Sequence, residues 1–480
     1  MKSSSLVVAL VAFLSGLAVF SVAGGFEDGS EDAVGRLQGE MAGEVTDSSV
    51  ILQGRLTAVR KALDGDVPGV EGWARFQVSV SPDFAEPLQM EWIKATEQND
   101  YIVKRRVGGL EADTRYYYRL LYGPDKTRLH KGPVHSFTTL PHRQARKGTK
   151  FAVVTGMNYY RFHDGPDAYK GPDKSRGYPA LETMAKMGPR FVVFTGDNVY
   201  YDHGDRALTE KELRKKWHEQ FVQERFHKLF SEVPAYWEKD DHDYRYNDCD
   251  NFGIMPPYPK LGKRIFKEQV PVTVASHDRT YRTHRAGKLL QIWLLENRDH
   301  RSPNIWPDGP RKTLWGKEQK EWLKRTLLAS DADFKIIISP TPMVGPDDGY
   351  KRDNHTNPKG FRHEGESFFA WARENGFLDK GLYLICGDRH WQYHSIHPRG
   401  FQEFSCGALV DANSRMGTRP GVPQSTDPQG EIVQPYTSRE PSGGFLMVDV
   451  KPEGNNNACI TFNFYDENGK LLYQKTIKKN

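Results

Sequence analysis

The sequence has few cysteines, and its opposite charges almost cancel. Only four cysteines occur in 480 residues, at positions 249, 386, 406 and 459, and none forms a CxxC pair. This spacing excludes a zinc ribbon and a small fold held together by disulfides, so we expect buried thiols, with one bridge as the alternative. Lys+Arg 67 against Asp+Glu 62 gives a net charge of +5. So weak an excess does not indicate a nucleic-acid-binding domain.

Long hydrophobic runs are also scarce, because the sequence has one such run and it lies at the N-terminus. Residues 6–22 contain no charge, follow Lys2 and end at Ser21-Val22-Ala23, where small residues suit a signal-peptidase site. We therefore expect a signal peptide at 1–23 and secretion to the periplasm or the cell exterior, with an uncleaved anchor as the alternative. No twin arginine precedes the run, which favours the general secretion route.

The remainder predicts two folded regions joined by a linker. Residues 24–45 are rich in Gly and Glu and are expected to be flexible. Residues 46–141 contain short alternating strands, and the segment 107–120 resembles the tyrosine corner of fibronectin type III-like sandwiches. We therefore expect a small all-β domain at 46–141, a basic linker at 142–149 and a larger domain at 150–480.

The larger region has the pattern of an α/β domain. Short apolar runs typical of strands buried on both faces begin near residues 151, 191, 234, 289, 334 and 382. A helical pattern occupies 315–328, and Asn468-Gly469 predicts a closing hairpin. This alternation predicts layered α/β architecture with ligands at the carboxyl ends of the strands.

Polar clusters follow three of these runs. They are Gly196-Asp197-Asn198-Val199-Tyr200, Asp240-Asp241-His242-Asp243 and Gly387-Asp388-Arg389-His390. Each alone is equally consistent with a capped or acidic turn. Carboxylate, imidazole and phenol groups gathered at one sheet edge are, however, typical ligands for hard and borderline cations. The three clusters together favour a metal site.

These motifs, with Asn247-Asp248 and Gln319-x-x-Trp322-Leu323, resemble the alkaline phosphatase D (PhoD-like) branch of the calcineurin-like metallophosphoesterases. The resemblance covers about 150–450. It implies a four-layer α/β/β/α sandwich, with the small β domain in the place of the branch's N-terminal sandwich. It also implies a dinuclear centre of Fe³⁺ together with Ca²⁺ or another divalent cation.

The resemblance also implies a role for each matching residue. Asp197 takes the place of the carboxylate that bridges both metals, and Tyr200 that of a tyrosinate bound to iron. The remaining metal positions are those of Asp241, Asp388 and His390.

The segment around His242 carries the expected proton chemistry. His242 matches the residue that protonates the leaving group or holds the phosphate, and Asp243 is expected to orient it. Arg298 and Arg389 are candidates for binding phosphate bidentately. Structural pairing of Arg298 with Asp299, or of Arg389 with Asp388, is the alternative.

Two positions depart from the family pattern. The first strand should end in an Asp or Cys ligand, but Met157 stands there, and a thioether suits a hard cation poorly. Asn158 is the expected substitute ligand. The fifth strand should offer a His or Gln and instead gives Pro340-Thr341.

We therefore expect a secreted metal-dependent hydrolase of phosphate esters, in which a metal-activated water attacks phosphorus and His242 assists the leaving group. Its substrate would be a phosphate monoester or diester, either a small molecule or a lipid. The alternatives are a phospholipase D-like diesterase and a non-catalytic phosphate-binding protein that keeps the fold. Met157 favours the last of these.

Overall fold

The computed structural model describes residues 34–58, 66–274, 279–454 and 456–479. The expected signal peptide at 1–23 lies outside the described residues. Within the described ranges, no helix combines the length and hydrophobicity that a membrane span requires. All four cysteines are described, buried and free, so the expectation of buried thiols is confirmed and no bridge forms.

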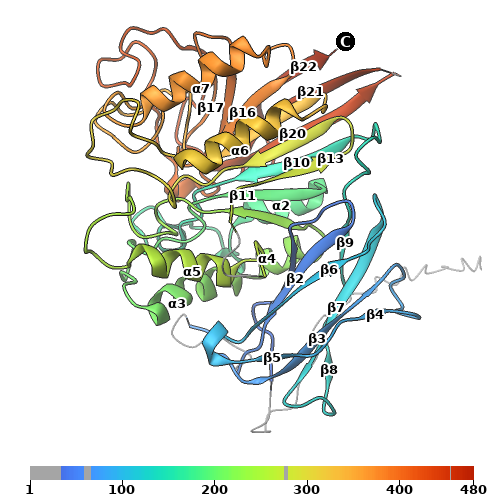
Figure 1. The fold of residues 1–480 in the computed structure, drawn as a ribbon. Coiled ribbons are helices and arrows are strands. Elements are labelled where there is room, and N and C mark those ends of the chain that lie inside the picture. The colour runs from blue at the N-terminus through green and yellow to red at the C-terminus, as the bar shows by residue number, and fades with distance from the viewer. Residues whose placement is uncertain (1–33, 59–65, 275–278, 455, 480) are drawn as a thin grey trace, which may run out of the picture. The chain divides into compact units, whose positions relative to one another are not determined.

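Two large sheets form the centre of the fold (Figure 1). The first has nine strands in the order β22 (Leu471–Lys479), β21 (Asn457–Asp466), β20 (Gly444–Glu453), β10 (Thr149–Val154), β11 (Phe191–Thr195), β12 (Ala235–Glu238), β1 (Glu40–Gly43), β2 (Ser49–Arg55) and β6 (Ile102–Gly108). The second has seven, in the order β13 (Arg282–Ala286), β14 (Leu290–Leu294), β15 (Phe334–Ser339), β16 (Leu382–Cys386), β18 (Gln402–Cys406), β17 (Gln392–Ile396) and β19 (Val433–Thr437).

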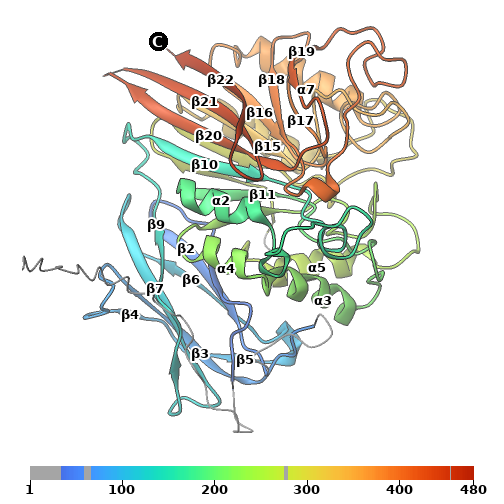
Figure 2. The ribbon, with the colours of Figure 1, turned by 180° about the vertical axis from the view of Figure 1, so that it is seen from behind.

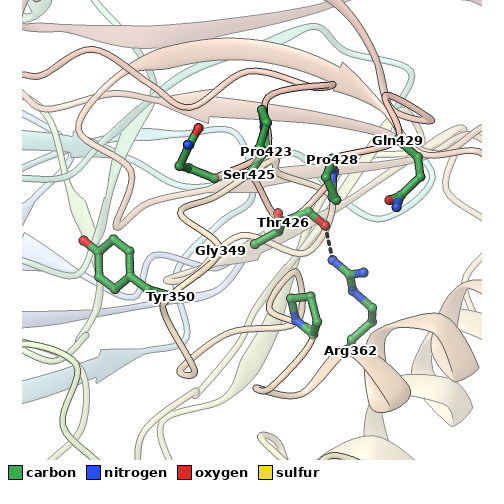
Figure 3. Close-up of a pocket in the computed structure, with 10 residues that line it drawn as sticks. Gly349, Tyr350, Arg362, Pro423, Ser425, Thr426, Pro428 and Gln429 are labelled. Atoms are coloured by element: carbon green, nitrogen blue, oxygen red, sulfur yellow. Dashed lines mark hydrogen bonds between the residues drawn. The ribbon is translucent and has the colours of Figure 1, made fainter.

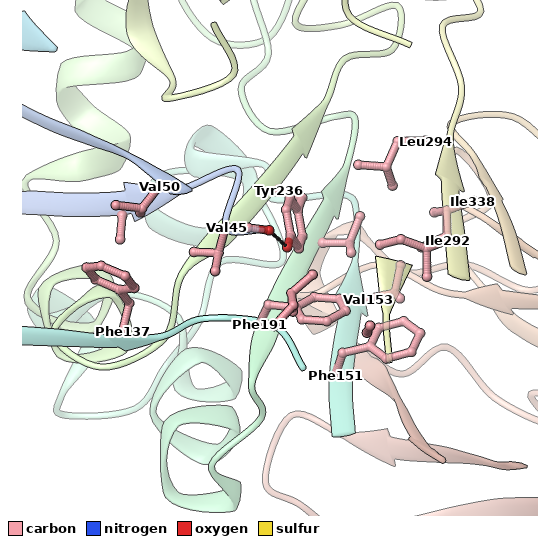
Figure 4. Close-up of a cluster of buried hydrophobic side chains, with 14 of the residues drawn as sticks. Val45, Val50, Phe137, Phe151, Val153, Phe191, Tyr236, Ile292, Leu294 and Ile338 are labelled. Atoms are coloured by element: carbon pink, nitrogen blue, oxygen red, sulfur yellow. Dashed lines mark hydrogen bonds between the residues drawn. The ribbon is translucent and has the colours of Figure 1, made fainter. Parts of the chain in front are cut away.

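The two sheets bury alternate side chains of their strands against each other. Phe151 and Val153 of β10 belong to the same buried cluster as Ile292 and Leu294 of β14 (Figure 4). Because successive strand residues point to opposite faces, the residues between them face the helices. Ala152 of β10, for example, packs in a second cluster on the outer face. Both faces of each strand are thus apolar, which explains the unbroken hydrophobic runs in the sequence.

Helices cover the outer faces of both sheets (Figure 2). The helices are α1 (Tyr159–His163), α2 (Pro179–Met187), α3 (Glu210–Phe221), α4 (Glu224–Phe230), α5 (Pro259–Gln269), α6 (Gly316–Leu328) and α7 (Arg362–Glu374). Side chains from α2 to α5 pack on the first sheet, and those of α6 and α7 pack on the second. The result is the expected α/β/β/α order of layers, which confirms the predicted fold class.

The N-terminal region adds a sandwich of strands. A third sheet contains β4 (Leu88–Gln89), β3 (Gly72–Ser79), β7 (Arg115–Gly123) and β8 (His130–Lys131), with β5 (Ile93–Ala95) and β9 (His135–Thr138) paired to its members. It shares a core with β2 and β6. Strand β1 differs from the flexible segment expected at 24–45, because it pairs in parallel with β12 and in antiparallel with β2, and is buried.

The carboxyl ends of β11, β12 and β16 meet at one place. Gly196 follows β11 so closely against β12 that a Cβ there would lie 2.5 Å from the Cβ of Asp240. Gly387 follows β16, and a Cβ there would lie 2.5 Å from the backbone oxygen of Thr195. These glycines let strand ends from both sheets approach each other and bring the three polar clusters of the sequence together.

Candidate metal centre

One half of the site is built around a tyrosine. At its centre is Asp197, whose Oδ2 lies 2.9 Å from the hydroxyl of Tyr200 and 3.1 Å from Nε2 of His390. The Tyr200 hydroxyl is also 3.3 Å from that same nitrogen. Asn413, the last residue of the short 3-10 helix Asp411–Asn413 after β18, donates from Nδ2 to the Tyr200 oxygen at 2.8 Å. We call Asp197, Tyr200, His390 and Asn413 the tyrosine half.

The other half gathers carboxylates against buried arginines. Asp240, Asp241 and Asp388 can each bring one oxygen to within 4.8 Å of the others. Arg298 donates from Nε to Oδ1 of Asp240 at 2.6 Å, and Arg389 donates to Asp388. We call these five residues the arginine half.

Asp241 joins the two halves. It forms a second such group with Asp197 and His242, again with one ligand atom each inside 4.8 Å. One of its oxygens, Oδ2, accepts the backbone N–H of Asp248 at 2.5 Å. The structure therefore brings together the predicted residues Asp197, Asp241 and His242 at the junction.

The donor set fits cations. Three buried carboxylate oxygens, Oδ1 of Asp197, Oδ2 of Asp240 and Oδ1 of Asp241, have no hydrogen-bond partner among the described residues. Leaving such atoms unpaired in a protein interior is costly. Carboxylate, phenol and imidazole groups are also the ligands that hard and borderline metals take.

The pKa values of the buried site residues also indicate that added positive charge would stabilise the site. Burial raises the pKa of Asp197 well above its ordinary value, and the nearby Asp241 and Asp240 raise it further. Burial likewise raises the pKa of the Tyr200 hydroxyl, as does the charge of Asp197. Asp241 differs: against the effect of burial, Arg298 and His242 hold its pKa well below the usual range.

His242 is oriented by a residue that the sequence analysis did not select. Nδ1 of His242 lies 2.7 Å from Oδ1 of Asp202, whose other oxygen accepts the backbone N–H of Asn247. Although burial opposes the charged form, Asp241, Asp197 and Asp202 raise the pKa of His242 well above its ordinary value. Asp202 follows Tyr200 by two positions, so its nearness to the motif was the available signal.

Asp243 does not take the orienting position expected for it. Its Oδ1 accepts the backbone N–H of Asp240 at 2.6 Å, and its Oδ2 accepts both the backbone and the side-chain N–H groups of Asn198. These bonds brace the turn after β12. The orienting contact to His242 expected from Asp243 is made by Asp202.

The two candidate phosphate-binding arginines are engaged by protein groups. Arg298 is fully buried and, besides Asp240, donates to the backbone oxygen of Cys249. Arg389 is also buried and pairs with Asp347 and Asp388. Both guanidinium groups thus balance carboxylates of the site, and phosphate binding by them stays a prediction. For Arg389, the partner Asp388 is the one named as the structural alternative.

The segment after β10 holds the first of the two departures, Met157, and its proposed substitute Asn158. Met157 is buried in the apolar cluster under the helices. Asn158 uses its Oδ1 to accept the backbone N–H of Arg161 at 3.0 Å, which caps α1. Its Nδ2 lies 2.6 Å from Nδ1 of His203, whose ring neighbours Tyr200. Asn158 therefore lies at the edge of the site, and metal binding by it stays a prediction.

A separate cavity of about 480 Å³ opens beyond the site (Figure 3). It is lined by Gly349, Tyr350, Pro358, Arg362, Pro423, Gln424, Ser425, Thr426, Pro428 and Gln429. Arg362 donates to the backbone oxygen of Thr426 across it. The lining offers no carboxylate, imidazole or thiol, so this cavity is not the metal centre.

Comparison with known families matches both regions of the chain. A model of the PhoD-like phosphatase family matches residues 151–441, and a model of the N-terminal domain of PhoD-like phosphatases matches residues 29–141. The chain belongs to the PhoD-like phosphatase family. The resemblance drawn from the strand-end motifs is thereby confirmed.

Individual relatives agree with this assignment. Alkaline phosphatase D of Bacillus subtilis (strain 168) is 23% identical over 334 residues, a match that spans 62% of this chain and 54% of that protein. Tartrate-resistant acid phosphatase type 5 of Mus musculus is 22% identical over 300 residues, 62% of this chain and 81% of that protein. The chain thus matches about half the length of the bacterial relative.

Solved structures show the same fold. A structure of PhoD superposes with a TM-score of 0.73 at 19% identity and covers 95% of this chain and 92% of that chain. The purple acid phosphatase PPD1 of yellow lupin (Lupinus luteus) superposes with a TM-score of 0.60 at 12% identity, over 91% of this chain and 73% of that chain. Both likenesses place the chain in the metallophosphoesterase fold.

Proposed function

We propose that this PhoD-like chain hydrolyses phosphate esters with a dinuclear metal centre. The observation that carries the proposal is the group formed by Asp197, Asp241 and His242, in which both carboxylates keep a buried oxygen without a hydrogen-bond partner among the described residues. Hydrolysis of a phosphate ester needs positive charge at the phosphoryl oxygens and a proton for the leaving oxygen. The group supplies ligands for the first and a protonated imidazole for the second.

The proposed metal ligands are those expected from the sequence, with one addition. They are Asp197, Tyr200, Asp241, Asp388, His390 and Asn158, together with Asp240, whose Oδ2 is unpaired. Tyr200 is the reason to propose Fe³⁺ in the tyrosine half. The proposed metal ligands of the arginine half are all carboxylates, which suits Ca²⁺ or another divalent cation. Two bound cations would neutralise phosphoryl oxygens and lower the pKa of the attacking water.

His242 is the proposed general acid. The carboxylates around the ring favour its protonated form, and Asp202 fixes the ring through Nδ1. Nε2 is thereby left to give its proton to the leaving oxygen. Asp202 is a positioning residue in this scheme, since it acts through His242.

Several finer features of the proposal rest on the sequence. They are secretion by a signal peptide at 1–23 and a domain boundary at 142–149. A diester substrate, including a phospholipase D-like reaction, stands beside a monoester, because both need the same charge neutralisation. A phosphate-binding protein without turnover is the outcome that Met157 would favour.

The test is reconstitution of the full chain. Protein stripped with a chelator is loaded with Fe and Ca, and its metal content is measured by plasma mass spectrometry. Hydrolysis of p-nitrophenyl phosphate and bis(p-nitrophenyl) phosphate is followed on the same samples. Two metals per chain with hydrolysis, both abolished in Asp197→Asn and retained in the exposed loop variant Asp205→Asn, support the proposal. Phosphate binding without turnover in the loaded chain would overturn it.

A further inference from the structure

Large apolar side chains are exposed in the loop between Asp248 and α5. Phe252, Ile254, Met255 and Tyr258 are 50%, 89%, 49% and 56% exposed. Ile305 and Trp306, in the segment after β14, are 80% and 49% exposed. Single exposed apolar residues are ordinary, but a gathered set of this kind marks an interaction surface. We call these residues the apolar tip.

We propose that the apolar tip inserts into the surface of a phospholipid membrane that carries negative charge, and thereby delivers the lipid diesters considered above to the adjacent site. The delivery rests on the proposed function. Three features of the described residues support the proposal: the rigidity of the tip, the charges beside it and its connection to the candidate metal ligands.

The tip is held rigidly with its side chains outward. Arg245 is fully buried beneath the loop, and its guanidinium donates to the backbone oxygens of Asp250, Phe252, Met255 and Pro257 at 2.6, 2.8, 2.7 and 2.8 Å. A guanidinium that binds so many carbonyl groups fixes the path of the loop. The apolar side chains therefore cannot turn inward without breaking these bonds.

The second segment is joined to the first. The backbone N–H of Asn304 donates to Oδ2 of Asp250 at 2.8 Å, and its side chain donates to the backbone oxygen of Asp248 at 2.7 Å. Nζ of Lys312 donates to the backbone oxygens of Asn304 and Trp306. Ile305 and Trp306 are thus presented next to the loop, and the tip is one surface.

Positive charge lies beside the tip. Lys312 also donates to the backbone oxygen of Lys359. Burial lowers the pKa of Lys312 to about 8. The charges of Asp308 and Asp250 oppose this shift and that of Arg352 adds to it, so Arg352 lies nearby together with two carboxylates. Arg352 and Lys359 are exposed, and neither forms an ion pair with another described residue. Apolar side chains flanked by cations are the pattern of interfacial membrane binding, where cations meet anionic headgroups.

The tip starts at the candidate metal centre. Two backbone N–H groups immediately before the loop bond the site: that of Asp248 donates to Asp241, and that of Asn247 to Asp202. A membrane docked on the tip would therefore hold headgroup phosphates at the edge of the group that contains His242. Among the substrates proposed above, only a lipid diester would use this surface.

The first test reads insertion at the tip itself. An environment-sensitive fluorophore is attached to Ile254→Cys in the full chain, since the four native cysteines are buried. Val80→Cys is the matched control, because Val80 is 65% exposed and lies in the N-terminal sandwich region. With vesicles of phosphatidylglycerol and phosphatidylcholine we expect a blue shift and quenching by brominated lipid at position 254 only. No change at 254, or an equal change at both positions, would overturn the proposal.

The second test separates docking from chemistry. The variant Phe252→Ser/Ile254→Ser should lose about tenfold of the activity toward phospholipid in vesicles, as expected when apolar area leaves the interface, and keep its activity toward bis(p-nitrophenyl) phosphate. Equal loss on both substrates would overturn the docking role. A wild-type chain that shows insertion at 254 but hydrolyses neither substrate would instead contradict the proposed function.

The charges are tested with the same vesicles. Arg352→Gln/Lys359→Gln should weaken binding to vesicles that contain phosphatidylglycerol and leave binding to pure phosphatidylcholine unchanged. If the tip binds a partner protein instead, neither the original chain nor any tip variant should bind vesicles. That result counts against the proposal.

Discussion

The two halves of the candidate metal centre differ in the groups that surround their buried carboxylates. In the arginine half, Asp240 and Asp388 each contact a buried guanidinium. In the tyrosine half, Asp197 contacts a hydroxyl and an imidazole, and burial holds the pKa of His390 well below its ordinary value, so the ring is neutral. The arginine half contains two guanidinium groups, whereas the tyrosine half has no cation of its own and relies on the neighbouring His242.

This difference predicts how each half depends on metal. A buried carboxylate without a cation is destabilising, so the tyrosine half gains most when a cation enters. In the arginine half the charges of Arg298 and Arg389 already balance part of the negative charge of Asp240 and Asp388, so a cation gains less there. We therefore expect the tyrosine half to bind the more highly charged ion and to bind it more tightly.

The largest effect is expected from removing the built-in charge. Arg298→Met leaves Asp240 and Asp241 buried without their cation, and breaking a buried pair in this way costs about 3–5 kcal/mol of the free energy of unfolding. Urea denaturation of the chelated full chain measures it. Adding Asp240→Asn to the same variant should restore part of the loss. If Arg298→Met costs no more than a surface substitution such as Arg311→Met, the arginine is not balancing the carboxylates.

The opposite sign is expected in the tyrosine half. Because the folded-state pKa of Asp197 is raised, the folded protein holds that proton more tightly than the unfolded chain, and stability falls as pH rises above the unfolded value of 3.8. Metal-free Asp197→Asn should therefore be more stable than the original chain by about 1–2 kcal/mol at pH 8, with the difference fading below pH 4. Urea titrations with chelator at both pH values give the answer. If chelated Asp197→Asn is less stable than the chelated original chain at pH 8, other groups already compensate the charge of Asp197 and the prediction is wrong.

The sequence predicted those features that depend on a single strand and on the residues that directly follow it. Apolar runs predicted the buried strands, and the glycines after β11 and β16 marked the turns that present Asp197 and Asp388. These are local properties, since burial on both faces demands apolar residues, and a positive φ at Gly196 and a close backbone approach at Gly387 favour glycine. The fold and the convergence of Asp197, Tyr200 and His390 followed from them.

The sequence was uninformative where partners come from distant segments. Asn413 reaches Tyr200 from 213 positions away, and Arg298 reaches Asp240 from 58. Nothing near Asp243 reveals that its oxygens are taken by Asn198, or that Asp202 faces His242 instead. Charge pairing depends on the packing of whole layers, and for that reason the contacts of Arg298 and Asp243 could not be read from the sequence.

A smaller effect should appear in the pH dependence of hydrolysis. The folded-state pKa of His242 is raised, so the protonated ring and the stability it contributes are present below the unfolded value of 6.5 and are lost as pH rises through the folded value. Asp202→Asn removes one carboxylate, lowers that pKa and should move the alkaline limb of kcat/KM about one unit toward lower pH. Asp243→Asn is the control: it should cost stability and leave the limb in place. If Asp243→Asn shifts the alkaline limb and Asp202→Asn does not, then Asp243 orients His242.

The smallest effect concerns the tyrosine oxygen itself. If Fe³⁺ binds Tyr200 as proposed, the loaded chain should show a visible charge-transfer band, and Tyr200→Phe should abolish it. Asn413 donates a hydrogen bond to the same oxygen, which lowers the energy of the phenolate electrons. Asn413→Ala should therefore keep the band and shift it to longer wavelength, while Asn375→Ala, at the C-terminal end of α7, leaves it unchanged. A band that survives Tyr200→Phe would show that the iron, and with it the asymmetry of charge between the two halves, does not depend on this tyrosine.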